Sequence, residues 1–145
     1  MNEALVGYCG LYCGGCPEFQ KTQAGNPSVG EDGKPIPCDG CKSGRVTAWC
    51  TECEIKKCNR RKGLSFCSEC GEYPCDILSD FMHMEKYVYH MEITEDFEQM
   101  KTTGIETWYQ KKEQEYYCNS CNHLNNWFEQ ECTGCGTKLK NGKNI

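Results

Sequence analysis

Residues 118–135 read CNSCNHLNNWFEQECTGC and contain two Cys-x2-Cys pairs that are ten residues apart. The four cysteines are Cys118, Cys121, Cys132 and Cys135. This spacing is typical of two knuckles that hold one tetrahedral zinc ion between them. A knuckle needs a residue that tolerates positive φ after its second cysteine, and Asn122 and Gly136 stand at these positions. We therefore predict a zinc site in a β ribbon of two hairpins.

The same segment is similar to the short zinc-ribbon family and to zinc fingers of the Ran-binding-protein type. The pattern Cys-x2-Cys-x3-Asn-x6-Cys-x2-Cys of the latter is matched with Asn125, while Tyr116 stands where that type prefers Trp. Some of these fingers bind ubiquitin or single-stranded RNA, but Asn122-His123 occupies the place of the Thr-Phe pair of the ubiquitin binders. The resemblance therefore implies a zinc site without these binding functions, and we expect His123 to lie on the surface.

Cysteine dominates the composition, with 15 cysteines among 145 residues, several times the ordinary share. The first residues, MNEALVGYCGLYC, show neither the basic nor the apolar region of a secretory signal, so we expect a cytoplasmic protein. A reducing cytosol and an odd cysteine count both favour metal ligation over disulfides. No apolar stretch approaches the length of a membrane span, and we expect no membrane association.

The N-terminal cysteines form a triplet and a pair. Cys9, Cys13 and Cys16 have the Cys-x3-Cys-x2-Cys spacing with which radical-SAM enzymes hold a [4Fe–4S] cluster. Those enzymes need a β/α barrel of roughly two hundred residues, and this sequence has neither the length nor the alternating strand and helix patterns. The alternative is that a zinc site forms across the following loop from Cys13, Cys16, Cys38 and Cys41.

The central cysteines repeat one spacing, Cys-x2-Cys-x4-Cys, in residues 50–58 and again in residues 67–75. We expect the first two cysteines of each copy to share a zinc site, made of Cys50, Cys53, Cys67 and Cys70. With the other two sites this predicts about three zinc ions per chain. The cysteines left over are Cys9, Cys58 and Cys75. They either bind a further metal, together with a histidine (His83 or His90), an exogenous ligand or bridging thiolates, or are simply buried thiols.

Ordinary helix patterns occur between residues 75 and 115. Apolar residues recur at helical spacing after Pro74, Thr94 is placed to cap a second helix, and Thr103 opens a capping box for a third. Shorter helices are expected among the cysteines, where Pro17 follows Cys16 and can start a helix.

Together these patterns predict a small α+β fold that is stapled by metal. An irregular Cys-rich region with short helices is followed by a helical middle and a C-terminal β zinc ribbon. We expect two domains, a Cys-rich metal-binding domain in residues 1–115 and the ribbon in residues 116–145.

Several motifs of the chain together resemble the DUF3795 family of small bacterial and archaeal proteins. They are CGLYCGGCPEF at residues 9–19, CDGC at 38–41, FCSECGEYPCDIL at 66–78 and GIETW at 104–108. The resemblance covers roughly residues 6–115, with the ribbon appended. It implies that the cysteines are metal ligands, and it leaves the activity open.

We expect a cytoplasmic zinc-binding protein whose metals are mainly structural and which serves as an interaction module. No HExxH, GxSxG or Gly-rich phosphate loop occurs in the sequence, so catalysis is not indicated. Closed four-cysteine zinc sites also lack an open coordination position. The alternative is an iron–sulfur or thiol redox protein that uses Cys9, Cys13, Cys16 and the left-over thiols.

A protein partner is expected for such a module, while a nucleic-acid partner is disfavoured. The formal net charge is −5, and each four-thiolate zinc site adds about −2 to the charge of the metallated form. Basic residues do cluster in residues 56–62, and the aromatic groups that could stack on bases are Tyr116, Tyr117, Trp127 and Phe128. The overall acidity nevertheless opposes binding to a phosphate backbone. The sequence leaves the partner and the oligomeric state open.

Overall fold

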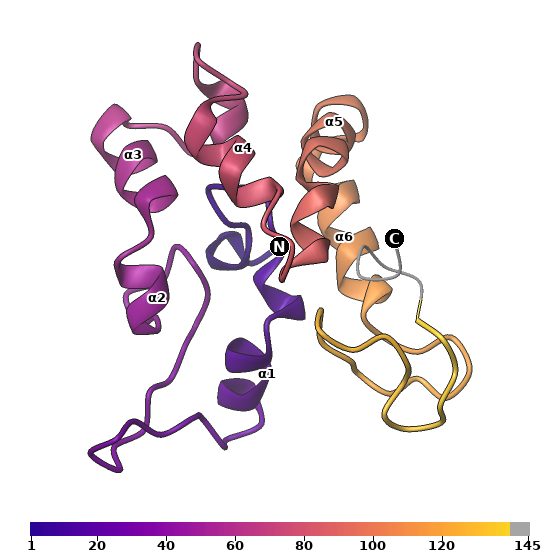
Figure 1. The fold of residues 1–145 in the computed structure, drawn as a ribbon. Helices are drawn as coiled ribbons and strands as arrows, with labels where there is room; N and C mark the ends of the chain where they lie inside the picture. Colours follow the sequence, from indigo (N-terminus) through magenta and orange to yellow (C-terminus); the bar gives the residue numbers. More distant parts are fainter. Residues whose placement is uncertain (140–145) are drawn as a thin grey trace.

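The computed structural model describes residues 1–139 of the chain, so residues 140–145 of the predicted ribbon lie outside the described part. The α-helices are α1 (Pro17–Gln23), α2 (Ala48–Thr51), α3 (Glu54–Lys62), α4 (Asp76–Met82), α5 (Ile93–Thr103) and α6 (Ile105–Glu115). Short 3-10 helices lie between them: η1 (Glu3–Leu5), η2 (Cys13–Gly15), η3 (Cys67–Glu69) and η4 (Val88–Glu92). In Figure 1 the N-terminal segment runs between α3 and α4 on one side and α5 and α6 on the other.

This N-terminal segment contributes to two apolar cores. Toward α6, Tyr12 packs edge to face on Trp108, with the ring centroids 6.5 Å apart. Toward α4 and α5, Tyr8 packs against a second core that contains the fully buried Leu78 and Ile93. Burial of one large apolar side chain contributes about 1.5–3 kcal/mol, so these contacts hold the N-terminal segment between the helices.

A buried group of charges joins α5 to α6. The Lys112 ammonium lies 3.0 Å from Asp96, 3.2 Å from Glu92 and 3.0 Å from Glu115. The indole N–H of Trp108 also donates to Asp96, at 3.0 Å. Burial alone would lower the pKa of Lys112, but the three carboxylates outweigh burial and raise this pKa, so the ammonium stays charged.

The three helices predicted between residues 75 and 115 are confirmed as α4, α5 and α6, although two of the predicted caps are wrong. Helix α5 already begins at Ile93, so Thr94 lies inside it. The Thr103 hydroxyl donates to a carbonyl of its own helix at 2.7 Å and does not cap α6. The two helices are separated at Gly104, whose φ of 88° favours glycine.

The predicted α+β class and the C-terminal β ribbon are wrong, because the described residues 1–139 contain helices and no strand. Residues 116–139 form loops with isolated β-bridges. The bridges pair Tyr117 with Leu124 and Glu131 with Lys138. The chain reverses direction at each Cys-x2-Cys pair. The segment between the two pairs turns again at Asn126, whose Oδ1 accepts a hydrogen bond from the Phe128 amide at 2.9 Å. The arms are therefore too short for the pairing to extend into strands.

Candidate metal sites

The four thiols of the C-terminal loops converge on one point. Cys118 Sγ lies 3.6 Å from Cys135 Sγ, and Cys121 Sγ lies 3.6 Å from Cys132 Sγ. All four sulfur atoms lie within 4.8 Å of one another. Sulfur atoms bonded at about 2.3 Å to a tetrahedral zinc ion lie about 3.8 Å from one another, so this cluster can hold a metal ion with little rearrangement.

The backbone of both C-terminal pairs forms a knuckle, as the sequence predicts. Asn122 has a φ of 61° and Gly136 a φ of 78°. Each of these residues donates its amide to the carbonyl of the first cysteine of its pair, at 2.8 Å. The amides of Ser120 and Gly134 donate to the sulfur of that first cysteine, at 3.4 and 3.3 Å. N–H groups that point at sulfur favour the thiolate, which is the form that binds a metal.

Asn125 connects the two knuckles and is only 1% exposed. Its side-chain oxygen accepts the Thr133 amide at 3.2 Å, and its side-chain nitrogen donates to the His123 carbonyl at 3.1 Å. Burial opposes ionisation of Cys132, but hydrogen bonds from Asn125 and from backbone amides outweigh it and lower the pKa of Cys132 to about 6. His123 is exposed, as predicted, and its ring bonds the Thr133 hydroxyl at 2.9 Å.

Seven other cysteines line one cavity of about 270 Å³ in the N-terminal part of the chain. They are Cys9, Cys13, Cys16, Cys38, Cys41, Cys50 and Cys53. They come from the loops around η2, from the loop before α2, and from the junction of α2 and α3. Much of the remaining wall is aromatic and includes Phe81, Tyr89, Trp127 and Phe128. We call this space the seven-thiol cavity.

The thiols of the seven-thiol cavity are more widely spread than those of the C-terminal cluster. Within residues 1–139, the C-terminal cluster is the one group in which three or more potential ligand atoms all lie within 4.8 Å of one another, and the cavity thiols do not meet this criterion. Burial raises the pKa of Cys9 and of Cys13, and it raises the pKa of Cys16 to about 11. The four cysteines predicted to share an N-terminal zinc site thus lie together, but in a wall with three further thiols.

A second and much smaller cavity, of about 20 Å³, lies beside α3 and α4. Its cysteines are Cys58, Cys67, Cys70 and Cys75. The repeated spacing predicts one shared site for Cys50, Cys53, Cys67 and Cys70. The structure separates these four cysteines, because Cys50 and Cys53 line the seven-thiol cavity. Of the three left-over cysteines, two lie in the small cavity and Cys9 lies in the large one. All 15 cysteines are free thiols. Four form the C-terminal cluster, seven line the seven-thiol cavity and four line the small cavity.

The two histidines considered as ligands differ in their surroundings. His90 lines the seven-thiol cavity and is 3% exposed, and its Nδ1 lies 2.8 Å from the Phe81 carbonyl oxygen. Burial lowers the pKa of His90, which favours the neutral ring. His83 is part of neither cavity wall, and its Nδ1 lies 2.7 Å from the Ser79 carbonyl oxygen. Only His90 is thus near a set of thiols.

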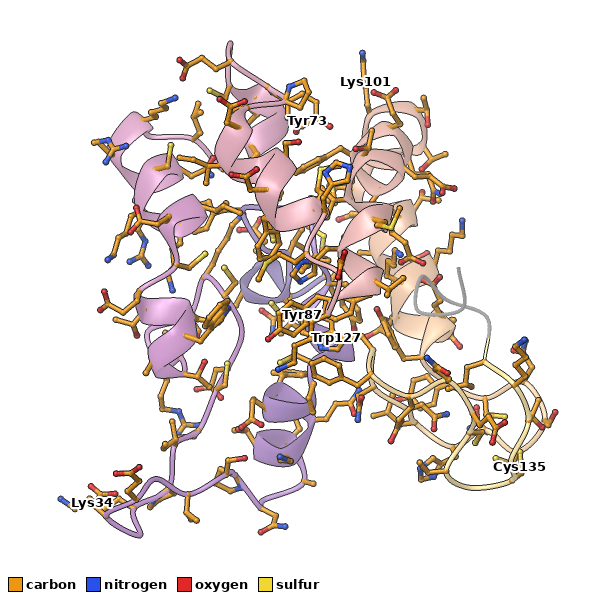
Figure 2. The ribbon with its side chains drawn as sticks, in the orientation of Figure 1. Lys34, Tyr73, Tyr87, Lys101, Trp127 and Cys135 are labelled. Carbon is orange, nitrogen blue, oxygen red and sulfur yellow. The ribbon has the colours of Figure 1, made fainter. Side chains whose placement is uncertain are left out.

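The C-terminal loops close one side of the seven-thiol cavity. Tyr87 and Trp127 both line this cavity, and Figure 2 shows them near the middle of the molecule, with Cys135 at the far end of the C-terminal loops. The Trp127 amide donates to the Gly15 carbonyl at 2.9 Å, and Gln20 donates to the Asn125 carbonyl at 2.9 Å. The Trp127 indole N–H is buried and has no hydrogen-bond partner among the described residues. Sequence reasoning missed this contact, because no local pattern links residues 15 and 127.

The aromatic residues considered for base stacking are only partly available. Tyr116 is 6% exposed and lies in the core with Tyr12. Trp127 is stacked on Tyr89. Tyr117 and Phe128 are 36% and 50% exposed. Tyr117 and Phe128 are thus the two of these four residues whose rings are clearly exposed.

The helices and the sets of free thiols define a cysteine-rich protein with at least one four-cysteine cluster that can hold a metal ion. Residues 5–80 match the model of a protein family of unknown function, DUF3795, and the chain belongs to this family. The match ends at residue 80, and the C-terminal cluster lies beyond it. No curated protein and no solved structure matches the chain. None of the described helices is long and apolar enough to cross a membrane.

Proposed function

We propose that this chain is an iron–sulfur protein whose C-terminal loops are held by a structural zinc ion. The observation that carries the proposal is the seven-thiol cavity, in which nearly half of the cysteines face one space of about 270 Å³. Soft thiolate ligands select zinc, copper(I) and iron–sulfur clusters. Free thiols in this number also suit a reducing compartment, which supports a cytoplasmic location.

The volume of the cavity and its seven thiols favour a cluster over a single ion. In a [4Fe–4S] cluster each thiolate binds a different iron, so the ligand sulfur atoms lie farther apart than around one zinc ion. Cys9, Cys13 and Cys16 have a spacing suited to three of the ligands. Cys41 is our candidate for the fourth, because it lies close to Cys9 and its backbone amide donates to the Cys13 sulfur.

The walls of the seven-thiol cavity also suit an iron–sulfur cluster. Aromatic side chains form much of the wall, and such apolar surroundings influence the stability and the potential of a cluster. The buried Trp127 N–H has no hydrogen-bond partner within residues 1–139, and a sulfur atom in the cavity would accept it. When bound, the cluster would supply one-electron chemistry, while the chain holds it and shields it.

The C-terminal cluster has a different task in this proposal. Its four thiols leave no open coordination position around one zinc ion, so a structural role follows. The ion would fix the loops that carry Asn125 and Trp127, and through them the side of the cavity that these loops cover. The sequence led us to expect an interaction module. In the present proposal the chain instead serves as a scaffold that holds the iron–sulfur cluster.

The test is purification of the full chain without oxygen, followed by analysis of iron, labile sulfide and zinc. We expect visible charge-transfer absorption with iron and sulfide in equal amounts. Cys13→Ser should lose iron and keep the C-terminal zinc, whereas Cys132→Ser should lose that zinc. A colourless chain that holds only zinc, even after reconstitution with iron and sulfide, would contradict the iron–sulfur proposal and favour purely structural metals.

A further inference from the structure

We infer that the small cavity beside α3 and α4 is a second structural zinc site, independent of the iron–sulfur proposal. Its ligands would be Cys58, Cys67, Cys70 and Cys75. The repeated Cys-x2-Cys-x4-Cys spacing leaves two of these cysteines without a role, and the fold brings them to the other two. The ion would fasten the middle of α3 to the segment that leads into α4.

The size of the cavity selects a single ion. Its volume of about 20 Å³ is close to that of one water-sized sphere, which takes about 10–15 Å³. The seven-thiol cavity is more than ten times larger, at about 270 Å³. Four thiols around such a small space match the four-thiolate set of structural zinc and leave no room for a cluster.

Hydrogen-bond donors already point at two of the four sulfur atoms. Asn59 Nδ2 donates to Cys67 Sγ at 3.1 Å, and Lys62 Nζ donates to Cys70 Sγ at 3.3 Å. The Glu72 amide donates to Cys70 Sγ at 3.5 Å. This last bond joins a sulfur to the amide two residues later, the same pattern that both C-terminal knuckles show. The small cavity therefore shares a local device with the cluster whose geometry already suits zinc.

The charges around the cavity suit a four-thiolate zinc centre, which carries a net charge of about −2. The Lys62 ammonium offsets part of this charge and is held in place by an ion pair with Glu72 at 2.6 Å.

The position of the ligands explains what the ion would do. Cys58 lies within α3, Cys67 begins η3, Cys70 caps η3 and Cys75 caps α4. Leu78 of α4 also lines the cavity and is completely buried. The four sulfur atoms are not within 4.8 Å of one another, so ion binding would draw α3 and the segment 67–75 together.

The first test is the zinc content of purified full-length variants. Cys58→Ser and Cys75→Ser should each lose one zinc equivalent per chain and keep the rest of their metal, including the C-terminal zinc. The control is Ser68→Ala, an exposed change between Cys67 and Cys70 that should keep all of the metal. If both cysteine variants keep the full zinc content, the inference is wrong.

The second test uses the unmodified protein, because a variant can also lose metal by failing to fold. A thiol-alkylating reagent is added to the native protein, and the modified cysteines are identified by mass spectrometry before and after a zinc chelator. We expect Cys58 and Cys75 to be protected at first and to react at least tenfold faster after zinc is removed. Equal rates before and after the chelator would overturn the inference, whatever metal the seven-thiol cavity holds.

Discussion

The Trp127 indole lies parallel to the Tyr89 ring, with centroids 4.4 Å apart and an angle of 12° between the planes. Tyr89 belongs to η4, whereas Trp127 belongs to the C-terminal loops between the two knuckles. Both residues line the seven-thiol cavity. The stack therefore joins the C-terminal cluster to the wall of the cavity, although the cavity cysteines all lie in residues 9–53.

Removal of this stack should loosen the wall of the cavity. Trp127→Ala is expected to lower the free energy of unfolding by about 2–3 kcal/mol, as for the loss of one large packed side chain. The same variant should release iron to a chelator faster than the parent protein. Trp127→Phe keeps a ring against Tyr89 and should retain most of the stability, while it lacks the buried N–H. Chemical denaturation and the rate of iron release measure both effects. Equal stability of the two variants would contradict the role of the stack, and iron release from Trp127→Phe at the rate of the parent protein would contradict the role of the N–H.

Asn125 should control the metal affinity of the C-terminal cluster without being a ligand. Asn125→Ala removes the acceptor for Thr133 and the donor that favours the Cys132 thiolate. Loss of such supporting bonds typically weakens metal binding by about 10–100-fold. Competition with a coloured zinc chelator measures the change. The control is His123→Ala, which should leave the affinity unchanged because His123 is exposed and its ring bonds only a threonine hydroxyl.

The buried Lys112 should be essential for the packing of α5 on α6. Lys112→Met leaves Asp96 and its neighbouring carboxylates without their cation, and breaking a buried pair in this way costs about 3–5 kcal/mol. The exposed neighbour provides the control, because Lys111→Met should change stability by less than about 0.5 kcal/mol.

The effect of pH gives this prediction a second readout. Burial already raises the pKa values of Asp96 and Glu92 in the parent protein. Without Lys112 the carboxylates also lose their cation and repel one another, so these pKa values rise further above the unfolded values of about 4. A carboxyl group with a raised pKa stabilises the fold below its unfolded pKa and loses that contribution as the pH rises. The stability gap between the parent protein and Lys112→Met should therefore be widest near neutral pH and should narrow toward pH 4. A gap that is independent of pH would show that the loss is steric.

The sequence predicts the C-terminal cluster well because its information is local. All four thiols lie within residues 118–135, and Asn122 and Gly136 adopt the positive φ that their positions require. The β ribbon fails for a different reason. Two knuckles fix the positions of the thiols, but they do not determine whether the short arms between them are straight enough to pair as strands.

The central cysteines show where spacing stops being informative. The two copies of Cys-x2-Cys-x4-Cys invite pairing of like with like, but Cys53 and Cys58 lie at different places along α3. Cys53 caps the start of the helix and lines the seven-thiol cavity, whereas Cys58 lies inside the helix and lines the small cavity. The helix therefore divides one repeat between two sites. Such a division depends on tertiary packing, which the spacing of one sequence does not contain.

Gly15 should be indispensable where the C-terminal loops meet the N-terminal segment. A Cβ atom at this position would overlap the ring of Tyr116, which is itself buried and stacked on Tyr12 with centroids 6.0 Å apart. Neither ring has room to move, so Gly15→Ala should destabilise the protein by about 1–3 kcal/mol. It should also weaken the bond from the Trp127 amide to the Gly15 carbonyl and thereby speed the release of iron. Gly44→Ala is the matched control, since Gly44 is exposed, has no neighbour within 4 Å of a new Cβ and should show neither effect. If Gly15→Ala unfolds at the same denaturant concentration as Gly44→Ala, the C-terminal loops do not pack on the N-terminal segment as described.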